Sequence, residues 1–355
     1  MQSFLQLVAH DLYAKIGNDL SRTALIFPNK RANLFFNEYL AGESDQPIWS
    51  PSAMSISDLF QKLSVQKSGD PIRLVCELYK VFKEETQSQE TLDDFYFWGE
   101  LLISDFDDVD KNMVDADKLF SNLQDLKNLM DDYEFLDKEQ EEAIQQFFQN
   151  FSIERRTELK EKFISLWDKL GTIYHHYREN LTELGIAYEG MLYRNVIEQL
   201  DTDQLKYDKY IFVGFNVLNK VENEFFRKLK DAGKALFYWD YDIFYTQQIR
   251  KHEAGEFLKR NLGEFPNELP ESFFDTFKEP KKIRYISAST ENAQARFLPE
   301  WIKMITDNHS QIAEEKEKEN AVVLCNEALL LPVLHSIPQE VKNVNITMGF
   351  PLAQT

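Results

Sequence analysis

The sequence has little of the chemistry that disulfide bonds and metal sites require. Two of its 355 residues are cysteine and six are histidine. Cys76 and Cys325 lie far apart and among apolar residues, so we expect two small buried side chains in a cytoplasmic protein. The sequence also lacks a run of about 18 apolar residues, so we expect no membrane-spanning helix.

Glycine is missing where a nucleotide would need it. A phosphate-binding loop has the pattern G-x-x-x-x-G-K-[ST], in which backbone N–H groups and the lysine surround the phosphates. Gly233-Lys234 is the one Gly-Lys pair in the sequence, and it has neither the earlier glycine nor the following hydroxyl residue. It also lies between a predicted helix and a predicted strand, the reverse of the required order. We therefore expect a degenerate ATP site and no bound cofactor.

Three segments carry potential metal ligands, but none has a convincing spacing. Asp240 and Asp242 follow a predicted strand, where acids more often close turns and cap helices than hold an ion, and a metal there is the less favoured alternative. The segment Asp105–Asp110 lacks the glycine and glutamate of a calcium loop and indicates a solvated helix end. His175 and His176 are adjacent, so they point in different directions on a helix. We expect no metal site and no catalytic residue.

Acidic residues are concentrated in one part of the sequence. The formal net charge is −20, which ordinarily argues against a nucleic-acid partner. Residues 84–205 hold 30 acidic and 11 basic residues, a net charge of −19, whereas the other 233 residues have a net charge of −1. The acidic segment should repel DNA and is better suited to a protein partner. The remainder is close to neutral and could carry a local basic groove.

Short apolar runs that lead into helices indicate an α/β fold. Thr23–Phe27, Lys209–Val213 and Ala235–Trp239 are such runs, and a further short strand is expected after Ile48. This pattern is typical of a parallel sheet buried on both faces, whose ligands bind at the carboxyl ends of the strands. Ser3 should cap a first helix that ends at Gly17. In the helix after the first strand, we expect the apolar residues Leu34, Phe35 and Tyr39 to face inward.

The pattern changes along the chain and predicts four parts. Residues 1–68 and 206–260 form a split α/β domain, and residues 69–205 form an acidic helical insertion with apolar residues at helical spacing. Residues 261–282, which contain Pro266, Pro270 and Pro280, are expected to be a linker. Residues 283–355 are expected to begin a second α/β domain. Its predicted strands are Ile283–Ser287, Ala321–Cys325 and Val344–Met348, too few for a complete domain, so we expect the chain to be a piece of a longer protein.

The strongest candidate contact site follows the first strand. Asn29, Lys30, Arg31 and Asn33 lie at the start of a helix, where backbone N–H groups and basic side chains together suit a phosphate oxygen. The alternative is a surface turn with two solvated cations. After the next strand, Ser55 and Ser57 could add hydroxyl contacts or could simply cap a helix.

The order of these pieces is similar to that of a known family. The series is "LIFPNKRANLFFNEYLA", "IWSPSAMSISDLFQKL", a helical block, "YIFVGFNVLNKVENEFFRKLKDAGKALFYWDYD" and "AVVLCNEALLLPVLHSIPQEVKNVNITMGFPL". It resembles the helicase-like half of AddB-type helicase–nuclease subunits. In particular it resembles the branch in which an inactivated superfamily I helicase is fused to a C-terminal PD-(D/E)XK (RecB-type) exonuclease. The resemblance spans nearly the whole chain and depends on the order and spacing of weak motifs.

The resemblance implies a degenerate RecA-like (P-loop NTPase-like) domain with a large helical insertion and the start of a second RecA-like domain. Phe27–Arg31 would correspond to helicase motif Ia and Ser55–Leu59 to the Ib region, both of which contact single-stranded DNA in active helicases. Tyr210–Phe215 would replace the Walker B strand, with Val213 where a carboxylate would be. The chain would begin at the helix that follows the absent first strand and its P-loop.

The implied function is non-catalytic. These residues would bind or guide single-stranded DNA for an attached nuclease in double-strand-break processing, and Mg²⁺ would be needed only by the nuclease beyond Thr355. A helicase–nuclease partner subunit is a further expected contact. The alternative is a structural scaffold that docks an active helicase and does not touch DNA.

Overall fold

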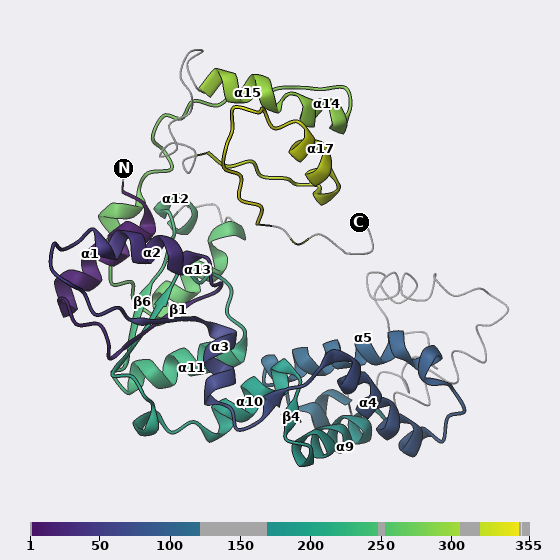
Figure 1. Cartoon of the computed structure of the whole chain (residues 1–355). Helices are drawn as coiled ribbons and strands as arrows, with labels where there is room; N and C mark the ends of the chain where they lie inside the picture. The colour runs from purple at the N-terminus through teal and green to yellow at the C-terminus, as the bar shows by residue number, and fades with distance from the viewer. Residues whose placement is uncertain (1, 121–168, 248–252, 306–319, 348, 350–355) are drawn as a thin grey trace. The chain divides into compact units, whose positions relative to one another are not determined.

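The chain divides into two compact units, Met1–Lys278 and Glu279–Thr355. The structure is a computed structural model that describes residues 2–120, 169–247, 253–305, 320–347 and 349 (Figure 1). In neither unit is any described helix long and apolar enough to cross a membrane.

A parallel four-stranded sheet forms the centre of the first unit. Its strands are β1 (Thr23–Phe27), β2 (Ser52–Ser55), β5 (Lys209–Val213) and β6 (Ala235–Tyr238), in the spatial order β2-β1-β5-β6. All three strand pairs are parallel. The predicted α/β class with a parallel sheet is therefore confirmed. Because all four strands run the same way, their carboxyl ends lie along one edge of the sheet.

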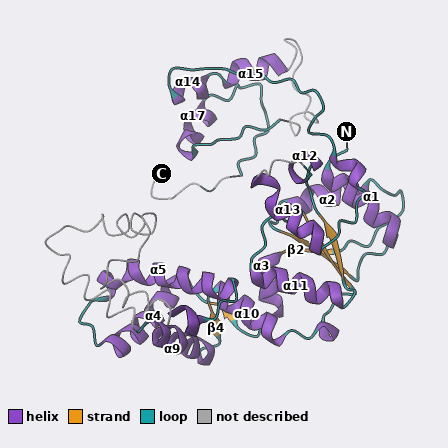
Figure 2. Cartoon of the chain, turned by 180° about the vertical axis from the view of Figure 1, so that it is seen from behind, coloured by secondary structure: helices purple, strands orange, loops and turns teal. Residues whose placement is uncertain are grey.

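Helices cover both faces of this sheet (Figure 2). Successive side chains of a strand point to opposite faces. Leu25 and Phe27 of β1 pack with α1 (Phe4–Ile16) and α2 (Ala32–Ala41). Ala24 and Ile26 belong instead to the core that includes α3 (Ile56–Leu63) and α11 (Lys220–Asp231). The α/β/α layering explains why β1, β5 and β6 are mainly apolar rather than alternating.

The first two helices show one correct and one incorrect prediction. Ser3 caps α1 by accepting a hydrogen bond from the Gln6 N–H, and Gly17 ends the helix with a φ of 86°. In α2, however, the predicted inward face is wrong in its main residues, because Leu34 is 69% exposed and Phe35 is 41% exposed. Phe36 and Leu40 are buried instead. The ring of Phe36 packs edge-on against Phe27 of β1, with 6.2 Å between centroids.

A helical block lies in the chain between β2 and β5. Its elements are β3 (Lys67–Ser68), α4 (Pro71–Thr86), α5 (Leu92–Lys111), α9 (Leu170–Glu183), β4 (Ile186–Ala187), α10 (Glu189–Gln199) and η2 (Thr202–Gln204). Strands β3 and β4 form a separate parallel pair. The apolar residues predicted at helical spacing in α4 and α9 are buried, among them Leu78 and Ile173. The predicted stripes within residues 121–168 lie outside the described residues.

The segment after β6 packs against the first unit. It contains α12 (Ile243–Thr246), α13 (Glu253–Glu264) and η3 (Glu271–Phe274). Phe265, Leu269 and Phe274 are buried in the cores that cover the sheet. Most of the predicted linker, residues 261–282, therefore lies with the first unit, and the division between units falls after Lys278. The prolines correctly predicted irregular backbone after residue 264, whereas the first residues of the predicted linker belong to α13. Buried apolar residues hold the irregular part in place.

The second unit has helices but no strand among its described residues. Its elements are α14 (Glu291–Arg296), α15 (Leu298–Ile305), η4 (Glu327–Leu329) and α17 (Leu330–His335). A small core includes Ala295, Leu298 and Val333. The strands predicted at 283–287, 321–325 and 344–348 are not formed in the described part, where Tyr285 is 91% and Val323 is 84% exposed. A strand needs a hydrogen-bonded neighbour, so apolar β-formers alone do not make one.

Candidate nucleic-acid interface

The two predicted contact segments lie side by side at the carboxyl edge of the sheet. Phe27, the last residue of β1, is in register with Ser55, the last residue of β2. The turn at 28–31 and the beginning of α3 are therefore neighbours. An ion pair joins them, with 3.0 Å between Lys30 Nζ and Asp58 Oδ1. Register in a parallel sheet thus brings together side chains that are 28 residues apart in the sequence.

Ser55 is a helix cap. Its hydroxyl oxygen accepts a hydrogen bond from the Asp58 N–H at 3.2 Å and donates to Asp58 Oδ2 at 2.7 Å. Asp58 Oδ2 in turn accepts from the Ser55 N–H at 3.2 Å, which completes a capping box. Ser55 is buried, with 7% of its surface exposed. Its hydroxyl group is occupied within the protein, so the capping interpretation of Ser55 is correct.

Ser57 points toward the helical block. Its hydroxyl lies 3.2 Å from Glu189 Oε1 at the start of α10. The same glutamate accepts from Lys111 Nζ at 2.7 Å and from the Tyr193 hydroxyl at 2.8 Å. Ser57 therefore connects the edge of the sheet to the helical block, and a hydroxyl contact to an external phosphate would have to replace this bond.

The remaining candidates shape the turn after β1. Asn29 Oδ1 accepts a hydrogen bond from the Arg31 N–H at 3.1 Å, a side-chain turn that favours asparagine here. Arg31 occupies the N-cap position of α2 without making a capping bond, and its side chain is exposed with no partner among the described residues. Asn33 is half-buried, and its Oδ1 atom has no hydrogen-bond partner in the described part of the chain. Within the described part of the chain, the Arg31 guanidinium is thus free to contact a ligand.

Lys30 is not equally available, because Asp58 stays charged beside it. The hydrogen bond from the Ser55 hydroxyl is the largest influence that lowers the pKa of Asp58, and the Lys30 ammonium lowers it further against the opposing effect of burial. At neutral pH the Lys30–Asp58 pair has no net charge. The positive charge of this edge is therefore smaller than the sequence implied.

Two apolar residues of α2 that were expected to face the core belong to this surface instead. Leu34 and Phe35 lie one turn after Arg31 on the outward face of α2 and are substantially exposed. The run Leu34-Phe35-Phe36 has three consecutive apolar residues. Such a run does not by itself indicate which member faces the core. We call Lys30, Arg31, Leu34 and Phe35 the α2 edge.

A glycine turn follows β5, and a helix-capping aspartate follows β6. Gly214 follows the strand with a φ of 73°, and its N–H donates to the Tyr238 carbonyl oxygen at 2.9 Å. Asp242 accepts from the backbone N–H groups of Phe244, Thr276 and Phe277 at 2.8 to 2.9 Å, so its predicted capping role is confirmed. Among the described residues, no group of three or more His, Cys, Asp or Glu side chains is placed to hold a metal ion.

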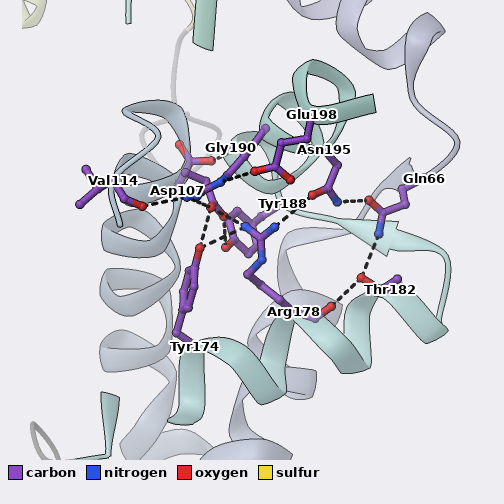
Figure 3. A network of polar contacts seen from close by, with 12 residues as sticks. Gln66, Asp107, Val114, Tyr174, Arg178, Thr182, Tyr188, Gly190, Asn195 and Glu198 are labelled. Carbon is purple, nitrogen blue, oxygen red and sulfur yellow. Dashed lines mark hydrogen bonds and ion pairs between the residues drawn. The ribbon is translucent and has the colours of Figure 1, made fainter. Parts of the chain in front are cut away.

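The predicted solvated helix end at 105–110 is wrong for its last residue. Asp110 is completely buried and accepts hydrogen bonds from the hydroxyls of Tyr174, at 2.6 Å, and of Tyr188. It also pairs with Arg178 and, at 3.3 Å, with Arg194. Tyr174, Arg178 and Tyr188 converge in this network (Figure 3). Acidic residues in a helix usually face water, and the sequence gives no direct sign that residues more than 60 positions away supply these partners. This network joins α5, α9 and α10.

The α2 edge thus places an exposed guanidinium, the Lys30 ammonium paired with Asp58, and two exposed apolar side chains close together in the chain. Neither a scan against protein-family models nor a search of curated proteins finds a match to this chain.

Proposed function

We propose that the chain is the non-hydrolysing, helicase-like part of a cytoplasmic DNA-repair helicase–exonuclease of the AddB type. In this proposal its first unit is a degenerate RecA-like domain, and the second unit begins another. The α2 edge binds single-stranded DNA and guides it to an attached nuclease during double-strand-break processing. The observation that carries the proposal is the exposed guanidinium of Arg31, which pairs with none of the described residues, at the carboxyl end of β1 beside the start of α3.

The location of Arg31 supports this proposal. Ligands of parallel α/β sheets bind outside the carboxyl ends of the strands. The edge has a free guanidinium but no phosphate-loop sequence and no metal-ligand cluster in the described residues, so an anion would be bound there without nucleotide chemistry. Contact with phosphates would make binding weaken as salt concentration rises, and it would be largely indifferent to base sequence.

Phe35 favours single-stranded DNA over duplex DNA as the ligand. It follows Arg31, the N-cap residue of α2, by four residues, a spacing that places two side chains on one face of a helix. An exposed aromatic ring next to a cation can stack on an unpaired base while the cation holds the backbone. Paired bases in a duplex do not offer their faces in this way.

A second candidate function is docking of a partner subunit without DNA. The observation in its favour is Leu34, which is 69% exposed and has no role in base stacking. Exposed apolar residues beside an arginine are also typical of the central part of a protein interface. The neutral Lys30–Asp58 pair fits this alternative as well.

Salt-dependent binding of a fluorescent single-stranded oligonucleotide, followed by anisotropy, tests the proposal. We expect Arg31→Ala to weaken binding and to reduce the slope of log K against log salt by about 0.7, the value for one phosphate contact on a single strand. Arg22→Ala is the matched control, because Arg22 precedes β1 at the opposite edge and pairs with Asp208. Equal binding by both variants, or none by the wild type at low salt, would favour the docking function.

A further inference from the structure

Asp58 is placed to compete with a DNA phosphate. One carboxylate oxygen, Oδ2, is fixed by the hydroxyl and the N–H of Ser55, and the other, Oδ1, lies 3.0 Å from Lys30 Nζ. The carboxylate therefore takes the place beside Lys30 that a phosphate oxygen would take. We propose that Asp58 is an internal competitor that limits the affinity of the α2 edge for single-stranded DNA, an inference that rests on the proposed function.

The two partners differ in how firmly they are held. The Asp58 side chain is 29% exposed and is anchored by the capping box, whereas the Lys30 side chain is 75% exposed. Lys30 can thus move to another anion while Asp58 stays in its position. The Ser55 hydrogen bond is the largest cause of the lowered pKa of Asp58, and this bond does not depend on Lys30. The competing negative charge therefore persists in both the free and the bound protein.

Lys30 should therefore contribute less free energy to DNA binding than Arg31 does. Lys30 must leave one anion to reach another, and the remaining Asp58 carboxylate then lies near the bound backbone. An exposed ion pair is a weak interaction, so we expect removal of this charge to strengthen binding by about two- to fivefold. A competitor of this strength suits a surface that must release and rebind a strand as the strand moves.

Asp58→Asn is the direct test, since asparagine keeps an oxygen for the Ser55 cap and loses the charge. Asp94→Asn is a matched control, because Asp94 forms the same kind of capping box with Thr91 in α5 and has no ion-pair partner among the described residues. We expect Asp58→Asn, and not Asp94→Asn, to raise the affinity for a single-stranded oligonucleotide two- to fivefold. In a Lys30→Met background the advantage of Asp58→Asn over Asp94→Asn should shrink, because only the repulsion between the Asp58 carboxylate and the bound backbone is left to remove.

A second readout does not involve DNA. An NMR titration of the Asp58 carboxyl carbon should give a higher pKa in Lys30→Met than in the wild type, because the ammonium charge that lowers it is gone. An unchanged pKa of Asp58 would overturn the competitor role but would leave the proposed function standing. So would equal affinities of Asp58→Asn and Asp94→Asn in a protein that binds DNA, and the proposed function would then stand. If no variant binds DNA, Asp58→Asn included, the proposed function fails and the competitor role fails with it.

Discussion

The Tyr174 hydroxyl donates a 2.6 Å hydrogen bond to the carboxylate of Asp110, although the two residues are 64 positions apart and lie on different helices. Arg178 of α9 and Arg194 of α10 both pair with the negatively charged carboxylate of Asp110. A buried carboxylate is costly unless its oxygens are hydrogen-bonded and its charge is paired, and here both conditions are met. The network therefore specifies how α5, α9 and α10 pack, beyond what their apolar residues determine.

Asp110→Asn should strongly destabilise the first unit. The substitution removes the anion, leaves Arg178 and Arg194 without their shared partner, and places amide N–H groups against donors. Breaking a buried ion pair by removing one partner costs about 3 to 5 kcal/mol. The free energy of unfolding, measured by urea denaturation with circular dichroism, checks this value. The control is Asp115→Asn, since Asp115 pairs with Lys118 at the surface and should change stability by no more than about 0.5 kcal/mol.

The strands and the network differ in how far the sequence predicts them. The runs Thr23–Phe27 and Lys209–Val213 are short, apolar and bounded by polar turns, and both form strands where expected. Their signal is local, because burial on both faces requires apolar residues throughout. The burial of Asp110 depends on Tyr174 and Arg178, which a linear pattern does not connect to it.

The candidate site was predictable in position but not in chemical state. The order of strands and helices places Lys30 and Ser55 at one edge, and the register between β1 and β2 brings them together. The sequence could not indicate that Asp58 would neutralise Lys30 or that Ser57 would bond to Glu189. These contacts depend on side-chain directions at the ends of elements, where one residue of difference changes the partner.

The orientation of α2 can be tested by comparing its apolar residues. Phe36→Ala should lower the free energy of unfolding by about 3 to 5 kcal/mol, because it removes a buried ring that packs on Phe27. Leu34→Ala should change it by no more than about 0.5 kcal/mol, because Leu34 is mostly in water. Urea denaturation of both variants gives the comparison. A larger loss for Leu34→Ala than for Phe36→Ala would mean that α2 faces the sheet with the side first predicted from its sequence.

Phe35 distinguishes stacking on bases from contacts to the backbone alone. Phe35→Ala should weaken binding of a single-stranded oligonucleotide by about 1 to 3 kcal/mol, the contribution of one stacked base. Phe35→Trp should bind the oligonucleotide as tightly as the wild type does, because tryptophan can also stack on a base. An oligonucleotide with abasic sites provides the control, because its affinity should not differ between the wild type and Phe35→Ala. Equal loss on both oligonucleotides would point to a change in the α2 edge itself rather than to stacking.

Asp242 should make stability depend on pH in the acid range. Burial raises its pKa, but the hydrogen bonds from the N–H groups of Phe244, Phe277 and Thr276 outweigh this effect, and the pKa is lowered. A lowered pKa means that the folded protein favours the charged carboxylate more than the unfolded chain does. The resulting stabilisation is present above the unfolded-state pKa of about 3.9 and is lost as the pH falls through the folded-state value.

As the pH falls from 6 to about 3, we therefore expect the unfolding free energy of Asp242→Asn to decrease less than that of the wild type. The variant should be less stable than the wild type at pH 6, because asparagine has no charge and keeps only one acceptor oxygen for the N–H groups that bond to both oxygens of Asp242. The difference should narrow as the pH falls, because the wild-type carboxylate also loses its charge. Asp45→Asn is the control, since Asp45 is exposed with no hydrogen-bond partner among the described residues. If the difference in unfolding free energy between Asp242→Asn and the wild type stays constant over this range, the charge of Asp242 does not stabilise the segment after η3.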